Sequence, residues 1–578
     1  MSRRRRRRIL WALGGVAVVG LWGAAAAASV AGAASDVRAG TAAVHRAQAG
    51  FELTDLATGR PLAHIGQAKV DFERAQRRIG SPLLQPARLL PVVGRQLESV
   101  IALVDAATEV TDTVLDTMVE TQRRLEAPPT SHPARVELVR ALGTLAGDAG
   151  RRLATVDLGP DVGLFGRLAR ARGELSTDLT ELRQRLEDGS TGAEAVAEML
   201  SGHHRYLVFA ANNAEMRAGS GMFLSVGELE ITDGGLRLGE MRPVTDVAVP
   251  KGAVPIEGDL SDRWGWLAPN VEWRNLMTSP RFDEAAPLAA RMWEAAGNRP
   301  VDGVLAIDPV ALRGLLAATG PITVDGRSVG ADSVVDLLLH AQYLRFPEDR
   351  TGRREELGAI ARAGVEALDQ RHWSVPNLVR SMKDVVAGRH AMLWSSRPVQ
   401  QAGWKALGVD GALRPDSLLV SVVNRGGNKL DQFLEVSADL SFAPQGTDTE
   451  VAVRVNLRNT TPKGEPSYVA GGEPNSGVPQ GVYLGIVSVN VPGAAAGLRI
   501  DGRETYAIAG ADGPTRVVGV QVRVEQGRSA TEVVRFVLPG HDGTIRVEPS
   551  ARVPGITWTG PNGPWSDGAS RDVVFSGL

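Results

Sequence analysis

The chain has 578 residues, a formal net charge of -2 and no cysteine. This length exceeds what one hydrophobic core holds, so we expect two to four folded units. The lack of cysteine excludes disulfides, thiolate metal sites and cysteine nucleophiles, and the near-neutral charge predicts no nucleic-acid partner.

The N-terminus combines a basic block with a long apolar segment. Arg3 to Arg8 are six consecutive arginines, and residues 9–34 follow without a charged side chain. About 20 apolar residues cross the hydrocarbon core of a bilayer, and arginines stay on the cytoplasmic side. We therefore expect a cytoplasmic basic tail over 1–8, a single transmembrane anchor over 9–34 and an extracytoplasmic chain beyond it, held at the cell membrane. The arginine block also attracts anionic membrane lipid.

A cleaved signal peptide is the alternative for the same segment. Ala31, Gly32 and Ala33 have the small side chains of a cleavage site. The uncharged run is longer than the apolar region of a typical signal peptide, which favours a retained anchor. Both interpretations place the rest of the chain outside the cytoplasm, and the sequence does not decide between them.

Residues 35–200 carry the periodicity of amphipathic helices, and we expect a helical stalk or bundle there. In the clearest segment, 91–126, apolar residues recur at steps of three and four on one helical face. Thr108 and Thr111 interrupt this face, which argues against a coiled coil that is stable alone. Further helices are expected over 136–153 and 164–186.

Residues 201–414 alternate between strand and helix patterns, which is typical of an α/β domain. Short apolar runs predict buried strands, and Asp-Gly-Gly at 233–235 predicts a tight turn. Asp308 and Pro309 stand at the expected start of a helix, as its cap and its first-turn proline. The expected strands are 206–210, 222–226, 228–231, 236–238 and 302–308, and the expected helices are 282–296, 309–318, 333–344 and 354–368.

Residues 415–578 form short β-rich segments separated by glycine-containing turns, which indicates a β-sandwich. Together the patterns predict a multidomain α+β protein. Its parts are a transmembrane helix, a helical stalk, a central α/β domain and a C-terminal β-sandwich. The expected strands of the last part are 417–424, 432–442, 449–457, 481–491, 515–525 and 531–538.

Several short motifs occur together in the middle and C-terminal parts of the chain. They are Leu207-Val208-Phe209, residues 212–217, Gly219 and Gly221, residues 302–309, Leu315-Leu316, residues 319–321, and Asn424, Asn428 and Lys429. In this combination the chain resembles an uncharacterised bacterial extracytoplasmic family, the domain-of-unknown-function family numbered four thousand and twelve. The resemblance implies a layout of anchor, helical region, this domain and a β-rich tail.

A second group of motifs is rich in arginine. Tyr343-Leu344-Arg345 precedes Asp349-Arg350 and Arg353-Arg354-Glu355. In this respect the central domain is similar, more distantly, to the LytR-CpsA-Psr ligases, which move a glycopolymer from a polyprenyl-pyrophosphate lipid to the cell wall. Guanidinium groups match phosphate oxygens, so the resemblance implies phosphate-binding arginines. The candidates are Arg217, Arg345, Arg350, Arg353 and Arg354.

Two positions depart from the ligase pattern. Residues 218–221 (Ala-Gly-Ser-Gly) stand where the ligases have an aspartate soon after their arginine, and Arg354-Glu355 replaces their closing Arg-Gln. We therefore assign no catalytic residue and no metal ligand. No cofactor is expected, and Mg²⁺ enters only if the ligase-like interpretation holds.

Polar residues are dense directly after the first predicted strand. Asn212, Asn213 and Glu215 are candidates for a polar site, and the alternative is a turn with local side-chain-to-backbone hydrogen bonds. For residues 345–354, the alternative to phosphate binding is a solvated helix start with carboxylate neighbours.

Two further groups of residues have open interpretations. Gly219 and Gly221 either let a ligand approach the backbone closely or form a bulge. Trp264, Trp266 and Trp273 either cover the core of the domain or, where exposed, stack on sugar rings.

The sequence leaves two functions. We expect a membrane-anchored extracytoplasmic cell-envelope protein that binds envelope glycan or a partner protein without catalysis, because the metal-ligand position is vacant. The alternative is a LytR-CpsA-Psr-like phosphotransferase that takes a glycopolymer from a polyprenyl-pyrophosphate lipid to the cell wall. The sequence names neither the glycan nor the oligomeric state.

Overall fold

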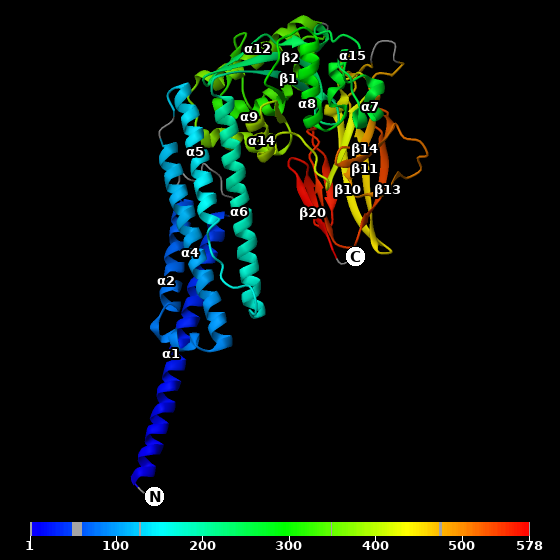
Figure 1. Ribbon diagram of the computed structural model, residues 1–578. Helices are drawn as coiled ribbons and strands as arrows, with labels where there is room; N and C mark the ends of the chain where they lie inside the picture. The colour runs from blue at the N-terminus through cyan, green and yellow to red at the C-terminus, as the bar shows by residue number, and fades with distance from the viewer. Residues whose placement is uncertain (1–2, 49–59, 127–128, 348, 473–476, 577–578) are drawn as a thin grey trace. The chain divides into compact units, whose positions relative to one another are not determined.

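The computed structural model describes residues 3–48, 60–126, 129–347, 349–472 and 477–576, with only the main chain described for residues 3–24, 91 and 350. The chain divides into two compact units (Figure 1). The first comprises Met1–Pro128 and Glu137–Ala193, and the second comprises Pro129–Val136 and Glu194–Leu578. The second unit therefore contains both the residues expected to form the α/β domain and those expected to form the β-sandwich.

Long helices form the first unit. They are α1 (Arg3–Gln48), α2 (Arg60–Ile79), α3 (Gln85–Arg88), α4 (Pro91–Leu125), and most of α5 (His132–Leu153) and α6 (Gly166–Met199). α1, α2 and α4 pack side by side through small and aliphatic residues such as Ala33, Ala75 and Ile79 (Figure 1). A Cβ on Gly40 of α1 would lie 2.8 Å from the ring of Phe72 in α2, so the close approach of these helices depends on glycine.

The two threonines that interrupt the apolar face of α4 are satisfied within the helix. Thr108 Oγ1 donates to the carbonyl of Val104 (2.9 Å), and Thr111 Oγ1 donates to the carbonyl of Ala107 (2.6 Å). Because each hydroxyl has its partner in the preceding turn, both side chains can be buried between helices. The expected N-terminal helical region is confirmed.

Among the residues whose side chains are described, no helix has the length and apolar character that crossing a membrane requires. The apolar segment 9–34 falls on α1, and most of it, up to residue 24, lies outside those residues. The anchor over 9–34 stays a prediction.

A mixed six-stranded sheet opens the second unit. Its strands are β1 (His203–Met216), β2 (Gly221–Thr232), β3 (Gly235–Leu238), β4 (Arg242–Pro243), β5 (Gly303–Ile307) and β8 (Ala391–Ser395). The order is β3-β2-β1-β5-β8 with β4 beside β2; β1 and β5 are parallel and the other pairs are antiparallel. Asp233 and Gly234 both have positive φ in the turn that joins β2 to β3, as a two-residue hairpin turn requires.

Helices surround this sheet. They are α7 (Gly258–Trp264), α8 (Phe282–Ala295), α9 (Pro309–Thr319), α12 (Arg350–Gln370), α13 (Val375–Ala387), α14 (Pro398–Ala406) and the short 3₁₀-helix η5 (Trp273–Thr278). α10 (Val334–Asp336), the π-helical turn η6 (Leu337–Ala341) and α11 (Gln342–Arg345) follow a small hairpin of β6 (Ile322–Val324) and β7 (Arg327–Val329). In the core, Phe209 stacks on Phe223 with ring centroids 4.5 Å apart, and Trp264, Trp273 and Trp293 pack in the same cluster.

Two six-stranded sheets complete the second unit. One has the order β13-β16-β11-β10-β18-β19 and the other β14-β15-β12-β9-β17-β20, and apolar residues of both sheets share one core. Their bounds are β9 (Ser417–Asn424), β10 (Leu434–Gln445), β11 (Asp448–Asn459), β12 (Tyr483–Pro492), β13 (Ala496–Ile500), β14 (Ile508–Asp512), β15 (Thr515–Val524), β16 (Ser529–Pro539), β17 (Gly543–Val547), β18 (Thr557–Gly560), β19 (Gly563–Ser566) and β20 (Arg571–Phe575).

The sheet that contains β9 is apolar on both faces. Val420 and Val422 of β9 face the core between the two C-terminal sheets, whereas Val423 and Ile486 join the cluster that holds Phe209 and the tryptophans. Every residue of β9 is buried. β9 and β12 therefore contribute to both clusters, because strands buried on both faces need a covering layer on each. The domain boundary expected at residue 414 stays a prediction.

Candidate functional site

The polar candidates 212–217 lie at a bulge of β1. Asn212 pairs with Met222 and Met216 with Gly221, so residues 213–215 of β1 have no partner on β2 and form the bulge. A Cβ on Gly221 would lie 2.4 Å from the main-chain carbon of Asn212, so the position admits glycine only. Of the two interpretations of this glycine, the bulge is the one that the geometry shows.

Gly221→Ala is therefore expected to destabilise the second unit by about 1–3 kcal/mol or more, because the added carbon meets the main chain rather than a movable side chain. Urea unfolding of the full-length protein in detergent, followed by tryptophan fluorescence, measures the change. Gly568→Ala is the matched control, since its Cβ would be 3.8 Å from the nearest atom, Ser566 Oγ. Equal midpoints for the two variants would contradict the steric argument.

Asn213 connects three distant parts of the chain. Its Nδ2 donates to Asp308 Oδ2 (2.8 Å) and to the carbonyl of Ala551 (2.7 Å). The other oxygen of Asp308 accepts from the first amides of α9, as its predicted role of helix cap requires, and Oδ2 also contacts His390 Nδ1 (2.6 Å). Asn213 thus holds the start of α9 against the segment before β18.

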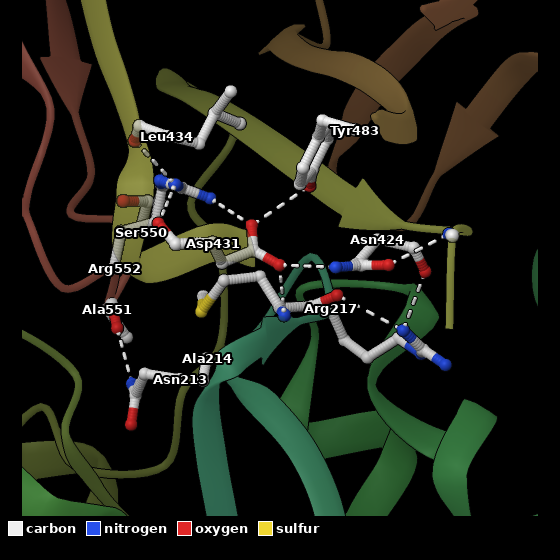
Figure 2. Close-up of polar contacts among 12 residues, drawn as sticks. Asn213, Ala214, Arg217, Asn424, Asp431, Leu434, Tyr483, Ser550, Ala551 and Arg552 are labelled. Atoms are coloured by element: carbon white, nitrogen blue, oxygen red, sulfur yellow. Dashed lines mark hydrogen bonds and ion pairs between the residues drawn. The ribbon is translucent and has the colours of Figure 1, made fainter. Parts of the chain in front are cut away.

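Asp431 is the centre of a buried polar network, shown in Figure 2. Its Oδ1 accepts from Tyr483 Oη (2.9 Å) and Arg552 Nη1 (2.8 Å). Its Oδ2 accepts from the amide of Met216 (3.0 Å) and from Asn424 Nδ2 (2.8 Å). One carboxylate on the 3₁₀-helix η7 (Leu430–Phe433) thereby joins the end of β1, β9, β12 and the loop after β17.

Arg217 is buried beside this network, with 5% of its surface exposed. Its Nη1 donates to the carbonyls of Asn424 (2.9 Å) and Met216 (3.2 Å) (Figure 2). Its Nε donates to the carbonyl of Arg274 (2.9 Å). Burial lowers the pKa of Arg217 to about 10, so the guanidinium stays charged at neutral pH. Most of its donors are engaged by main-chain oxygens.

Glu215 forms a buried ion pair with Lys429. Lys429 Nζ also lies 5.3 Å from the ring centroid of Tyr343 and 4.5 Å from that of Tyr468. Arg353 stacks on the Tyr468 ring at 4.0 Å and donates to the carbonyl of Phe346. Burial opposes the charge of Lys429, but the Glu215 carboxylate and the two tyrosines raise its pKa above the ordinary value.

Only some of the predicted site residues come together. Asn212 donates to Tyr343 Oη (3.2 Å), so Asn212, Glu215 and Arg353 all lie around Tyr343. Arg217 has other partners, as described above. Arg345 is paired with Glu356, Arg354 is exposed, and the side chain of Arg350 lies outside the described part of the structure.

The tyrosine–lysine cluster predicts an alkaline loss of stability. Burial raises the pKa of Tyr343 to about 12, and the pKa of Lys429 is also raised. A group whose pKa is higher in the folded protein than in the unfolded chain stabilises the folded state. This stabilisation is complete below the pKa of the unfolded chain, about 10, and is lost as the pH rises towards the pKa of the folded protein. The urea midpoint should therefore fall as the pH rises from about 10 to about 12. The urea midpoint of the Tyr343→Phe variant should fall less steeply over this pH range. An identical pH profile for the variant and the unmodified protein would contradict this assignment.

Arg217 also lines a cavity of about 200 Å³. The remaining lining residues are Met222, Glu272, Arg274, Asn275, Asn424, Arg425 and Gly427. Among the described residues, no group of three or more His, Asp or Glu side chains is placed to hold a metal ion. The arrangement offers positive charge and hydrogen-bond donors.

The tryptophans predicted together differ in exposure. Trp264 and Trp273 are buried in the core, and Trp273 Nε1 donates to the carbonyl of Val247 (2.8 Å). Trp266 is 55% exposed and its Nε1 donates to the carbonyl of Arg263 (2.9 Å). Two of the three cover the core, and one presents its ring to solvent.

Sequence reasoning missed Asp431, Arg552 and Arg425 as members of this region. Asp431 follows the Asn424 to Lys429 motif closely, so a motif carried two residues further would have included it. Arg552 stands in a stretch without any motif and joins the network only through folding.

Residues 201–343 match a family described as Protein of unknown function (DUF4012). This match confirms the resemblance expected from the motifs between residues 207 and 321, and the motif of Asn424, Asn428 and Lys429 lies outside the matched segment. A comparison with curated proteins finds no match, and neither does a comparison with solved structures. The likeness to the LytR-CpsA-Psr ligases stays a prediction.

Proposed function

We propose that the protein is a membrane-anchored, extracytoplasmic component of the cell envelope whose second unit binds envelope glycan or a partner protein without catalysing a reaction. The proposal of a membrane anchor rests on the arginine block Arg3 to Arg8 and the uncharged segment 9–34. This order of charge and apolar residues favours a retained helix with the bulk of the chain outside.

The proposal that the protein is not a catalyst rests on one observation: the charged side chains at the candidate site are paired with other groups of the same chain. The Asp431 carboxylate accepts four hydrogen bonds, and Glu215 is paired with Lys429 in a buried position. A general acid, base or nucleophile must reach the reacting atom of a substrate. Because these side chains are paired within the protein, we assign them a structural role, and the function that we propose is binding.

Reporter fusions after Leu578 test the location. Alkaline phosphatase fused there should be active, because it folds only outside the cytoplasm, and β-galactosidase at the same position should be inactive. A matched deletion of residues 3–34 should reverse both results, since the chain then lacks its export segment. Activity of β-galactosidase on the intact chain would contradict the proposal.

The ligase-like phosphotransferase remains the second candidate because Arg217 lines a cavity. Binding of a polyprenyl pyrophosphate to the full-length protein, with and without Mg²⁺, separates the two. The ligase-like function requires Mg²⁺-dependent binding that Arg217→Ala and Arg353→Ala abolish while the urea midpoint stays measurable. We expect no such dependence, since both guanidinium groups already have protein partners.

A further inference from the structure

The cavity beside Arg217 carries an excess of positive charge. Arg217, Arg274 and Arg425 line it together with one carboxylate, Glu272. Arg274 forms a bidentate ion pair with the Glu272 carboxylate, with Nε 2.9 Å from Oε1 and Nη2 2.7 Å from Oε2. Two guanidinium charges therefore remain without an acidic counterpart in the lining.

Arg425 is the less engaged of these two. It is partly buried, and no carboxylate in the described part of the chain lies within ion-pair distance of its guanidinium. Burial lowers the pKa of Arg425 below its ordinary value. A partly buried cation without an anion is unfavourable for the fold, and such costs are typically retained where function uses them.

The main chain under Arg425 is held in place. Its amide donates to the carbonyl of Leu484 (2.8 Å), and the next amide, of Gly426, donates to Asn424 Oδ1 (2.9 Å). Asn424 is itself bound by the Asp431 network. The guanidinium therefore projects from a fixed loop, as a binding group requires.

An aromatic ring stands next to this charge. The guanidinium carbon of Arg425 lies 5.2 Å from the ring centroid of Trp266. Trp266 is stacked on Trp264 at 6.4 Å and its Nε1 is bound by a carbonyl, so an exposed ring is kept in a defined position. Fixed exposed indoles favour the apolar faces of sugar rings.

A larger cavity of about 330 Å³ elsewhere in the second unit lacks this imbalance. Three glutamates and three arginines line it, and Arg299 lies 3.6 Å from Glu230, so its charges compensate one another. At about 200 Å³, the cavity at Arg425 is smaller than the roughly 300–1,000 Å³ that enclose a whole drug-sized ligand. It suits one charged group of a ligand that extends beyond the rim.

We propose that this cavity binds the anionic group of a saccharide, a carboxylate or a phosphate, through the Arg425 guanidinium beside the positive charge of Arg217, while Trp266 contacts the sugar ring. Guanidinium groups recognise both anions through forked hydrogen bonds. The inference rests on the proposed envelope function and deepens it by naming an acidic glycan as the ligand.

Calorimetric titration of the full-length protein in detergent tests the site with four probes: methyl glucuronide, glucose 6-phosphate, methyl glucoside and inorganic phosphate. We expect at least one acidic sugar to bind at least tenfold more tightly than the neutral glucoside, with an affinity that falls as salt is added. Comparison of the two acidic sugars identifies the anion. Equal binding of glucoside and acidic sugars would overturn the proposal.

Three variants localise the binding. Arg425→Ala should weaken the acidic sugar at least tenfold without lowering the urea midpoint, because it removes an uncompensated charge. Trp266→Ala should weaken the sugar and leave inorganic phosphate unchanged, whereas Arg523→Ala, an exposed arginine on β15, should change neither. Unaltered binding by Arg425→Ala would overturn the assignment.

Failure of this inference and failure of the proposed function have different signatures. If only neutral glycans bind, and Arg425→Ala has no effect, the acidic ligand is overturned while an envelope function stands. If the C-terminal reporter proves cytosolic while acidic sugars still bind through Arg425, the site stands and the envelope assignment fails.

Discussion

Asp431→Ala is expected to lower the free energy of unfolding of the second unit by about 3–5 kcal/mol. The substitution leaves the Arg552 guanidinium, with 1% of its side chain exposed, without its carboxylate. It also removes the acceptor of Tyr483 Oη and of the Asn424 amide. Domains have about 5–15 kcal/mol of stability in total, so this loss is large.

Urea unfolding of the full-length protein in detergent measures this change. Tryptophan fluorescence reports on the second unit, because every tryptophan after Trp22 lies within it. Asp572→Ala is the control: its carboxylate is 59% exposed and pairs with Arg546 at 3.1 Å. Exposed pairs contribute about 0–1 kcal/mol, so similar losses in both variants would show that the buried network adds nothing special.

Lys429→Met is expected to cost about 3–5 kcal/mol as well, because it leaves the Glu215 carboxylate buried without its cation. Adding Glu215→Gln to the same chain should restore much of the loss, since the double variant has no buried charge to leave unpaired. The double-mutant cycle should give a coupling energy of about 0.5–3 kcal/mol, measured by the same unfolding experiment.

The exposed pair of Arg523 and Glu525, at 2.8 Å, provides the reference cycle. Its side chains are about half exposed, and the expected coupling is below about 1 kcal/mol. If the buried pair showed no more coupling than this one, the cluster around Tyr343 would not hold the second unit together.

The sequence predicts the elements well where their signal is local. The helix expected at 309–318 is α9, Pro309–Thr319, because an aspartate cap and a first-turn proline mark its start. The strand expected at 417–424 is β9 with the same ends, because apolar β-formers lie between turn residues. Both patterns are contained within a few residues of the element itself.

Polar contacts between residues far apart in the chain could not be predicted from the sequence. The sequence predicts that the first strand ends at residue 210, because Asn212 and Asn213 are typical of turns. In the structure β1 continues to Met216, and both asparagines are buried. Arg552 and Asp431 are separated by 121 residues and meet only after folding. Charged residues are usually exposed, so nothing local distinguishes a buried network from a solvated surface.

The candidate site was predicted in part for the same reason. Asn212, Glu215 and Arg353 do converge on Tyr343, but Arg217 binds main-chain oxygens instead. The role of Arg425 at the cavity could not be foreseen from the sequence. Its charge stands out only once the lining carboxylate, Glu272, is seen to pair with Arg274 instead.

The double-sided burial of β9 has a practical consequence for expression. The family match stops at residue 343, yet the sheet it begins gains an edge strand at 391–395 and a covering layer from β9 and β12. A fragment cut at the match would expose aliphatic surface over Phe209 and precipitate from solution. Crystallisation trials are better begun with a piece that runs from the end of α6 to the C-terminus.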